Sequence, residues 1–143
     1  MPLCANSLKC PASRGIFHSG IIFMTRFGLL LTSDGFASQS LASVLQFART
    51  AVQQGYTIEH IFLYQDAVYC VSADNDLPAD EPDLSTELAV FCQQHGIPLL
   101  FCITAAEKRG VVNSLKQPKQ GYIAAGLAEF AMRQTNIDKL IQF

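Results

Sequence analysis

The stretch from Pro98 to Val111, PLLFCITAAEKRGV, decides how the rest of the chain can be arranged. Its first half, residues 99–103, is a short and continuously apolar run, typical of a strand that is buried between helices on both faces of a sheet. Thr104 is the expected N-cap of a short helical turn, and Gly110 is expected to end that turn. Cys102 would therefore stand where a buried strand ends and a helix begins, which is where open α/β sheets bind ligands.

A thiol at this junction has two interpretations. The free N–H groups and partial positive charge of a helix N-terminus stabilise anions, and the thiolate is the reactive form of cysteine. Buried cysteines are also common as inert core residues, so position alone leaves a reactive and a packing Cys102 open. Ala105 would lie in the first turn beside the thiol. Arg109 would either add positive charge to the site or be an exposed residue at the helix end.

Strands and helices alternate along the chain around this stretch. Apolar runs predict three further strands, at residues 26–32, 58–64 and 139–143. Helical spacing predicts three helices, at residues 41–52, 84–95 and 123–131. Residues 65–72 are ambiguous, with a helical turn as one interpretation. The alternation predicts a small, open and mostly parallel α/β sheet with helices on both faces, of the flavodoxin-like kind.

We expect these four strands to lie in the order 2-1-3-4, counted along the chain. The first strand would then neighbour the strand that ends at Cys102, and a ligand would bind between their carboxyl ends. The loop from Ser33 to Ser38, which is rich in small and hydroxyl residues, would share that crevice, so Ser33 and Gly35 are candidate supporting residues. This loop could cradle the phosphate of a flavin nucleotide, although ordinary turn chemistry explains its composition equally well.

Length and composition favour one compact domain. The chain has 143 residues, of which 50% are hydrophobic and 15% are charged. We assign residues 24–143 to that domain and expect residues 1–23 to be a disordered or non-native extension without chemistry.

The net charge of -2 argues against a dedicated nucleic-acid-binding protein, which needs a basic face. No apolar run approaches the roughly 18 residues that a membrane span requires.

The cysteines and histidines show no metal-binding pattern. Five cysteines without a CxxC pair predict neither a zinc site nor a disulfide framework, and fit the reduced thiols of a cytoplasmic protein. Cys92 shares a helix face with apolar residues and should pack in the core. Cys70 should also pack, with a second redox-active thiol as the alternative. No GxSxG or Walker motif is present, so serine hydrolase and P-loop functions are excluded.

Several short motifs carry a resemblance to a known family. The most specific is Cys102 followed by ITAAEKRGV, which matches an active cysteine before an A-A-x-x-R-G-V segment. The other matches are R-F-x-x-x-x-T from residue 26, QFA at 46–48, FLY at 62–64, VY at 68–69, QHG at 94–96, G-Y-x-x-x-G-L from residue 121 and the terminal QF. On these residues the chain from Arg26 to Phe143 resembles the DsrE-like sulfur-relay family.

The resemblance implies a function for Cys102. It would accept a sulfane sulfur as a persulfide and pass it on, in the relay that supplies sulfur for 2-thiouridine at the wobble position of tRNA. A TusA-like protein would be the donor and a TusE-like protein the acceptor. The subunit would be cytoplasmic, in a hetero-hexamer with TusB-like and TusC-like subunits, without direct contact with nucleic acid or a membrane. The chemistry needs no metal and no organic cofactor.

Three other functions stay open at the level of the sequence. The same sulfur chemistry could serve a DsrE-type subunit in dissimilatory sulfur oxidation. The chain could also be a non-catalytic assembly subunit in which Cys102 only packs. A flavin-nucleotide module, which would not need the thiol, is the third.

Overall fold

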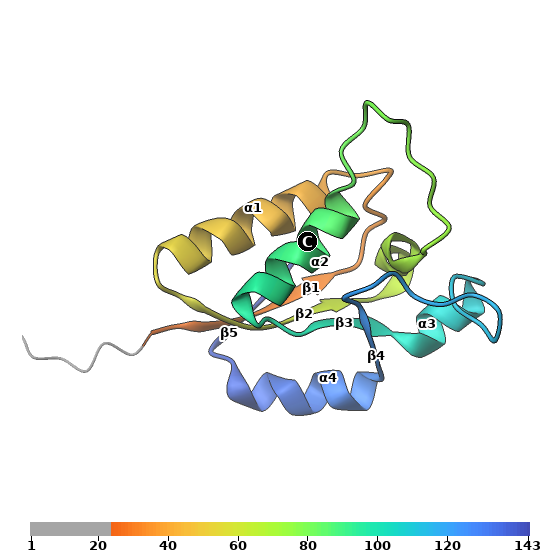
Figure 1. Cartoon of the computed structure of the whole chain (residues 1–143). Coiled ribbons are helices and arrows are strands. Elements are labelled where there is room, and N and C mark those ends of the chain that lie inside the picture. Colours follow the sequence, from red (N-terminus) through yellow and green to blue (C-terminus); the bar gives the residue numbers. More distant parts are fainter. Residues whose placement is uncertain (1–23) are drawn as a thin grey trace, which may run out of the picture.

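The structure, a computed structural model, describes residues 24–143. They form an open sheet of five parallel strands in the order β4-β3-β2-β1-β5, with helices on both faces (Figure 1). The predicted α/β class with a mostly parallel sheet is therefore confirmed. The extension expected at residues 1–23, which includes Cys4 and Cys10, lies outside the described residues.

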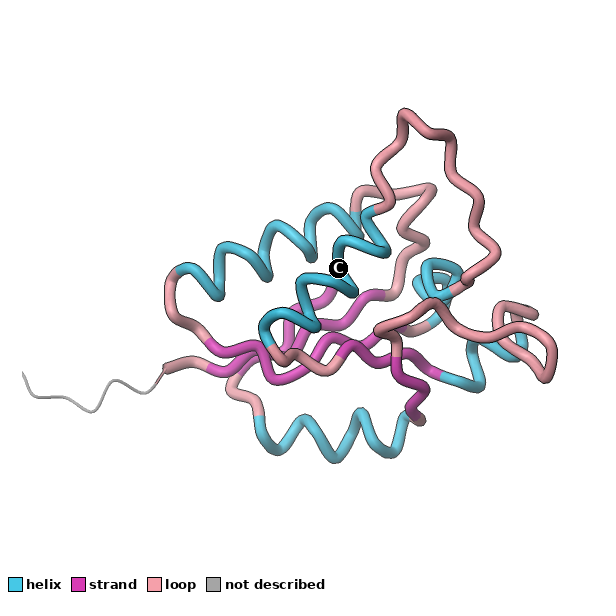
Figure 2. The backbone as a smooth tube through the Cα atoms, in the orientation of Figure 1, coloured by secondary structure: helices cyan, strands magenta, loops and turns pink. Residues whose placement is uncertain are grey.

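The elements alternate between strand and helix along most of the chain. They are β1 (Arg26–Leu31), α1 (Ser40–Gln53), β2 (Thr57–Leu63), the 3-10 helix η1 (Gln65–Val71), α2 (Leu84–His95), β3 (Leu99–Cys102), α3 (Ile103–Lys108), β4 (Ile123–Ala125), α4 (Leu127–Arg133), the 3-10 helix η2 (Gln134–Asn136) and β5 (Lys139–Gln142). The long loop between η1 and α2, which carries a cluster of acidic residues, stands away from the sheet (Figure 2).

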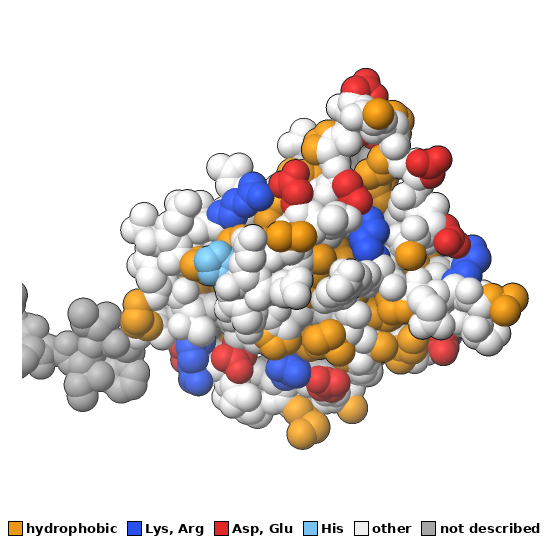
Figure 3. All heavy atoms as spheres, in the orientation of Figure 1, with side chains coloured by type: hydrophobic (Ala, Val, Ile, Leu, Met, Phe, Trp, Pro, Cys, Tyr) orange, Lys and Arg blue, Asp and Glu red, His pale blue; other side chains and the backbone are white. Residues whose placement is uncertain are grey.

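The two faces of the sheet are covered unequally. Helices α1 and α2 lie together over one face, and α4 lies alone over the other (Figure 1). No residue of α4 is fully buried, and its half-buried Phe130 places its ring centroid 4.6 Å from that of Phe62 in β2. Leu127 and Met132 of α4 are exposed, and apolar side chains appear on the outer surface of this helix (Figure 3).

The expected strand order 2-1-3-4 is wrong. β2 lies between β1 and β3, with Leu63 opposite Leu31 on one side and opposite Phe101 on the other. The physical reason is burial: Ile61, Phe62 and Leu63 are all fully buried, and the buried backbone N–H and C=O groups of such a strand need a neighbouring strand on each edge as a partner. β5 carries polar and exposed residues and therefore occupies an edge.

Two expectations about helix starts are also wrong. Residues 123–125 belong to strand β4, which pairs with the edge of β3, so α4 begins only at Leu127. α3 begins at Ile103, and Cys102, in extended conformation, occupies the N-cap position in place of Thr104. Asp83 caps α2 by accepting from the Thr86 N–H, and the segment at 65–71, which the sequence leaves ambiguous, forms the 3-10 helix η1.

His60 is a buried polar residue on the α4 face of the sheet. Its side chain is fully buried, and neither ring nitrogen has a hydrogen-bond partner among residues 24–143. Phe130 meets the imidazole ring at 86° with centroids 5.9 Å apart, and a Cβ added to Gly28 would lie 3.0 Å from the ring. Burial lowers the pKa of His60 below 6.5; the charge of Arg133 lowers it further, and Glu59 partly opposes this.

We expect His60→Leu to raise the free energy of unfolding at pH 7 by about 1–2 kcal/mol, because it removes two unsatisfied nitrogens.

The stability of the wild type should also depend on pH through His60. The His60 imidazole binds a proton more weakly in the folded state than in the unfolded state, so the free energy of unfolding should fall as pH drops below 6.5 toward the lower folded pKa. Urea unfolding between pH 5 and 8 should show this slope in the wild type and a smaller slope in His60→Leu. His95→Gln, at an exposed histidine, is the control and should keep the wild-type slope.

Candidate active site

Cys102 stands where β3 ends and α3 begins. It pairs with Ala125 of β4 on one side, and β2 runs along the other side of β3. Only 3% of the residue is exposed, yet it lines a pocket of about 290 Å³. The pocket is lined by residues from four elements and the turn after β2: Tyr64, Gln65, Cys102, Thr104, Ala105, Lys108, Arg109 and Leu127. The thiol is thus shielded from bulk solvent but borders an opening.

The start of α3 provides polar groups beside this sulfur. Because α3 begins directly after Cys102, its first backbone N–H groups have no partner within the helix. Ala105 is buried in the first turn, whereas Thr104 is exposed on the pocket wall. The structure therefore brings Cys102, Thr104, Ala105 and Arg109 together, as the sequence predicts.

The guanidinium of Arg109 is held by three hydrogen bonds. Its Nε and Nη2 donate to Oδ1 of Asp66 at 3.0 and 2.8 Å, and its Nη1 donates to the carbonyl oxygen of Ala105 at 3.3 Å. Lys108, the neighbouring cation on the pocket wall, is exposed. The pocket thus has two cationic residues at its rim, one of which is fixed by a carboxylate.

Tyr64, Gln65 and Leu127 also line the pocket, and sequence analysis did not find them. Gln65 has φ of 54°, in the left-handed region, and it is the one non-glycine residue with positive φ in the described part of the chain. This conformation costs a non-glycine residue of order 1 kcal/mol and is often found at functional sites. It turns the chain sharply from β2 into η1, so that Tyr64 and Gln65 face the pocket.

Ser33 and Gly35 do not join this site, which corrects the expectation. A Cβ added to Gly35 would lie 2.6 Å from Sγ of Cys70, and neither residue lines the Cys102 pocket. The reason is the strand order: β2 separates the end of β1 from the end of β3. The Ser33–Ser38 loop instead covers Cys70.

The other described cysteines differ from Cys102 in their surroundings. Burial raises the pKa of Cys70 to about 11, and a backbone hydrogen bond from Gly35 offsets only part of this effect. Burial raises the pKa of Cys92 to about 12. Both thiols should be protonated at neutral pH, and a thiol is a poor nucleophile. Their environments fit packing roles.

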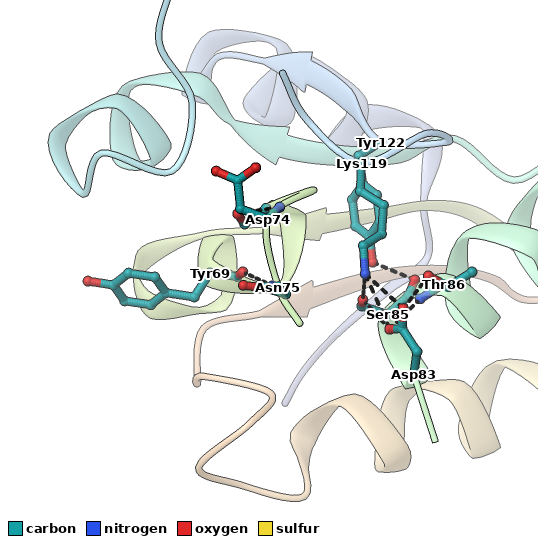
Figure 4. Close-up of polar contacts among 9 residues, drawn as sticks. Tyr69, Asp74, Asn75, Asp83, Ser85, Thr86, Lys119 and Tyr122 are labelled. Atoms are coloured by element: carbon teal, nitrogen blue, oxygen red, sulfur yellow. Dashed lines mark hydrogen bonds and ion pairs between the residues drawn. The ribbon is translucent and has the colours of Figure 1, made fainter. Parts of the chain in front are cut away.

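A network of polar side chains positions β4, the strand beside Cys102 (Figure 4). Lys119 donates from Nζ to Oδ2 of Asp83 at 3.0 Å and to Oγ of Ser85 at 2.6 Å. Tyr122 donates from its hydroxyl to the Ser85 carbonyl oxygen at 2.8 Å. The Lys119 N–H also donates to the Val71 carbonyl oxygen. These contacts, which we call the Asp83 network, tie the segment before β4 to the start of α2 and to the end of η1.

Metal-binding clusters and membrane-spanning helices are both absent from residues 24–143. Residues 24–143 contain no group of three or more His, Cys, Asp or Glu side chains that could hold a metal ion. No helix within the same residues has both the length and the apolar character needed to cross a bilayer.

Comparison with known proteins gives related sequences and folds. Residues 25–143 match the DsrE/DsrF-like family. The chain is 33% identical over 127 residues to sulfurtransferase TusD of Erwinia tasmaniensis, which covers 82% of this chain and 99% of that protein. The crystal structure of the ychN protein from E. coli has a TM-score of 0.70 at 21% identity, covering 84% of this chain and 100% of that one.

A second solved structure extends the likeness in fold. The protein of unknown function MTH1491 from Methanobacterium thermoautotrophicum has a TM-score of 0.58 at 15% identity, covering 83% of this chain and 99% of that one. At these identities the two structures show the fold alone. The resemblance seen in the sequence is confirmed, and the TusD relative supports the assignment to the sulfurtransferases. This chain belongs to the DsrE/DsrF-like family.

Proposed function

We propose that Cys102 accepts a sulfane sulfur as a persulfide and passes it to an acceptor thiol, in the relay that supplies 2-thiouridine at the wobble position of tRNA. One observation carries the proposal: the cysteine of the family-like block borders a pocket at the start of a helix. The other described cysteines are buried thiols whose pKa values are raised by burial.

Each transfer is an exchange of one sulfur atom between thiolates. The Cys102 thiolate attacks the outer sulfur of the donor persulfide, the donor S–S bond breaks, and the donor leaves as a thiolate. The acceptor thiolate then attacks the outer sulfur on Cys102, and the Cys102 thiolate is restored. No net oxidation or reduction of the protein occurs. The unpartnered N–H groups at the start of α3 and the cations of the rim lie beside the position that the sulfur occupies in both steps.

The proposed partners follow from the same relay. A TusA-like protein would charge Cys102 and a TusE-like protein would discharge it, with TusB-like and TusC-like subunits completing a cytoplasmic hetero-hexamer. The exposed apolar residues of β4 and α4, Ile123, Leu127 and Met132, support an assembly surface of this kind.

The direct test is mass spectrometry of the full chain after incubation with a persulfide-charged TusA-like protein. The mass should increase by one sulfur atom, and the peptide that contains Cys102 should carry it. A reductant should remove the added mass. An unchanged mass would favour the non-catalytic assembly subunit, and sulfur on Cys70 or Cys92 would contradict the assignment of the site.

The choice of acceptor separates thiolation of tRNA from sulfur oxidation. A TusE-like protein with its tRNA thiouridylase should receive labelled sulfur from charged Cys102, and the label should appear in tRNA. Transfer only to an acceptor of the dissimilatory pathway would assign the chain to sulfur oxidation, with the same chemistry at Cys102.

A further inference from the structure

One ion pair joins the two walls of the Cys102 pocket. The turn after β2 forms one wall and α3 forms the other. Asp66, in the first turn of η1, accepts two hydrogen bonds from Arg109 at the end of α3. We propose that Asp66 is a positioning residue that, through Arg109, sets the width of the entrance to Cys102 and so limits the size of the group that reaches the thiol. The proposal deepens the proposed function, on which it rests for the role of Cys102.

The first support is the way Arg109 is fixed to its own helix. Besides the two bonds to Asp66, its Nη1 donates to the Ala105 carbonyl oxygen at 3.3 Å. The guanidinium therefore links η1 to the backbone of α3, and α3 begins at Cys102. Because a planar guanidinium with several bonds is geometrically specific, it holds the two walls at a defined separation.

The second support is the limited access to the sulfur. Cys102 is 3% exposed, so a reagent or a partner thiol must enter through the pocket rather than meet the thiol at the surface. A small change in the distance between the walls would therefore change which groups can enter. Small reagents should be affected less than large ones.

The third support is the strained residue next to Asp66. Gln65 lines the pocket with φ of 54°, a conformation that persists only where the surrounding structure holds it. The ion pair of Asp66 is one such constraint, since it fixes the residue that follows Gln65. The ion pair of Asp66 in η1 thus holds the turn after β2, which forms one wall of the pocket.

The test compares two neutral alkylating reagents, iodoacetamide and a maleimide that carries a bulky polyethylene glycol chain. Their rates at Cys102 are followed by mass analysis of the Cys102 peptide in the full chain. Asp66→Ala should raise the ratio of the bulky-reagent rate to the small-reagent rate by about twofold to fivefold, the range for a partly exposed ion pair. Asp66→Glu, which keeps the carboxylate, should stay near the wild-type ratio.

A matched control comes from an ion pair away from the pocket. Nη2 of Arg49 and Oε2 of Glu87 are 3.1 Å apart, and the two side chains are 49% and 44% exposed. Glu87→Ala should therefore leave the ratio unchanged. High salt should raise the ratio in the wild type and have little effect in Asp66→Ala, because salt screens exposed pairs.

Two results would overturn the proposal. One is an unchanged ratio in Asp66→Ala, and the other is an equal rise in both rates, since then the pair would not select by size. The alkylation ratio does not depend on sulfur transfer. A chain that shows the expected ratio but gains no sulfur from the donor would therefore contradict the proposed function and leave the role of Asp66 standing.

Discussion

Cys102→Ser is expected to reduce sulfur transfer from the donor to the acceptor by roughly a thousandfold or more, because a serine hydroxyl can neither form a persulfide nor act as the leaving thiolate. Fold and assembly should persist, since Ser is close to Cys in size and the residue, although buried, borders a pocket. The measurement is the rate at which labelled sulfur reaches the acceptor protein, together with urea unfolding of the variant.

Cys70→Ser and Cys92→Ser provide the comparison. Both thiols are buried and their pKa values are raised, so neither change should slow transfer more than its effect on stability explains. Both should lower the free energy of unfolding, because a hydroxyl replaces a packed sulfur atom. Comparable loss of transfer in Cys70→Ser would instead favour a second redox-active thiol. Full transfer by Cys102→Ser would refute the assignment.

Asp83→Ala is expected to lower the free energy of unfolding by about 1–3 kcal/mol. The carboxylate caps α2 and also accepts the Lys119 ammonium at 3.0 Å, so the change removes both contacts. Lys119, whose side chain is only 15% exposed, would keep Ser85 as a partner but lose its counter-charge. Burial acts to raise the Asp83 pKa, and the surrounding hydrogen bonds outweigh it and hold the pKa well below its usual range.

Asp83→Asn separates the two contributions. Its side-chain oxygen can still cap α2, so the loss of stability in Asp83→Asn relative to the wild type reports the ion pair with Lys119, and the further loss in Asp83→Ala reports the cap. Denaturant unfolding at neutral pH measures both. In Asp83→Ala, hydrogen exchange should also increase in β4, because the Asp83 network ties the preceding segment to α2. Equal stability of Asp83→Ala and the wild type would show that the network does not hold the segment.

The sequence predicted the parts of this protein that depend on local pattern. The buried run at 99–102, the helix at 84–95 and the left-handed Gly110 each follow from a few consecutive residues, and the structure contains them. Cys102 at a strand-to-helix junction was predicted in the same way. Thr104 failed as the cap because a preceding residue, Cys102, already has the extended conformation that the cap position needs.

The candidate site was only partly predictable. Tyr64 and Gln65 line the pocket because β2 adjoins β3, and this follows from which strand is buried on both edges, not from the local pattern at residues 64–65. Asp66 reaches Arg109 across 43 residues of sequence, and Lys119 reaches Asp83 across 36. Contacts of such separation have no periodic signature that a single sequence reveals.

By itself the sequence determined the class of the fold, the position of Cys102 at the end of a buried strand, and the family. Hydrophobic periodicity and capping act over a few residues, so they can be read along the chain. Only the tertiary structure decided the strand order and which residues surround Cys102. It also decided that Ser33 and Gly35 lie outside the Cys102 pocket. The reason is that strand order minimises the exposure of all strands together, a property of the whole sheet that no single segment carries.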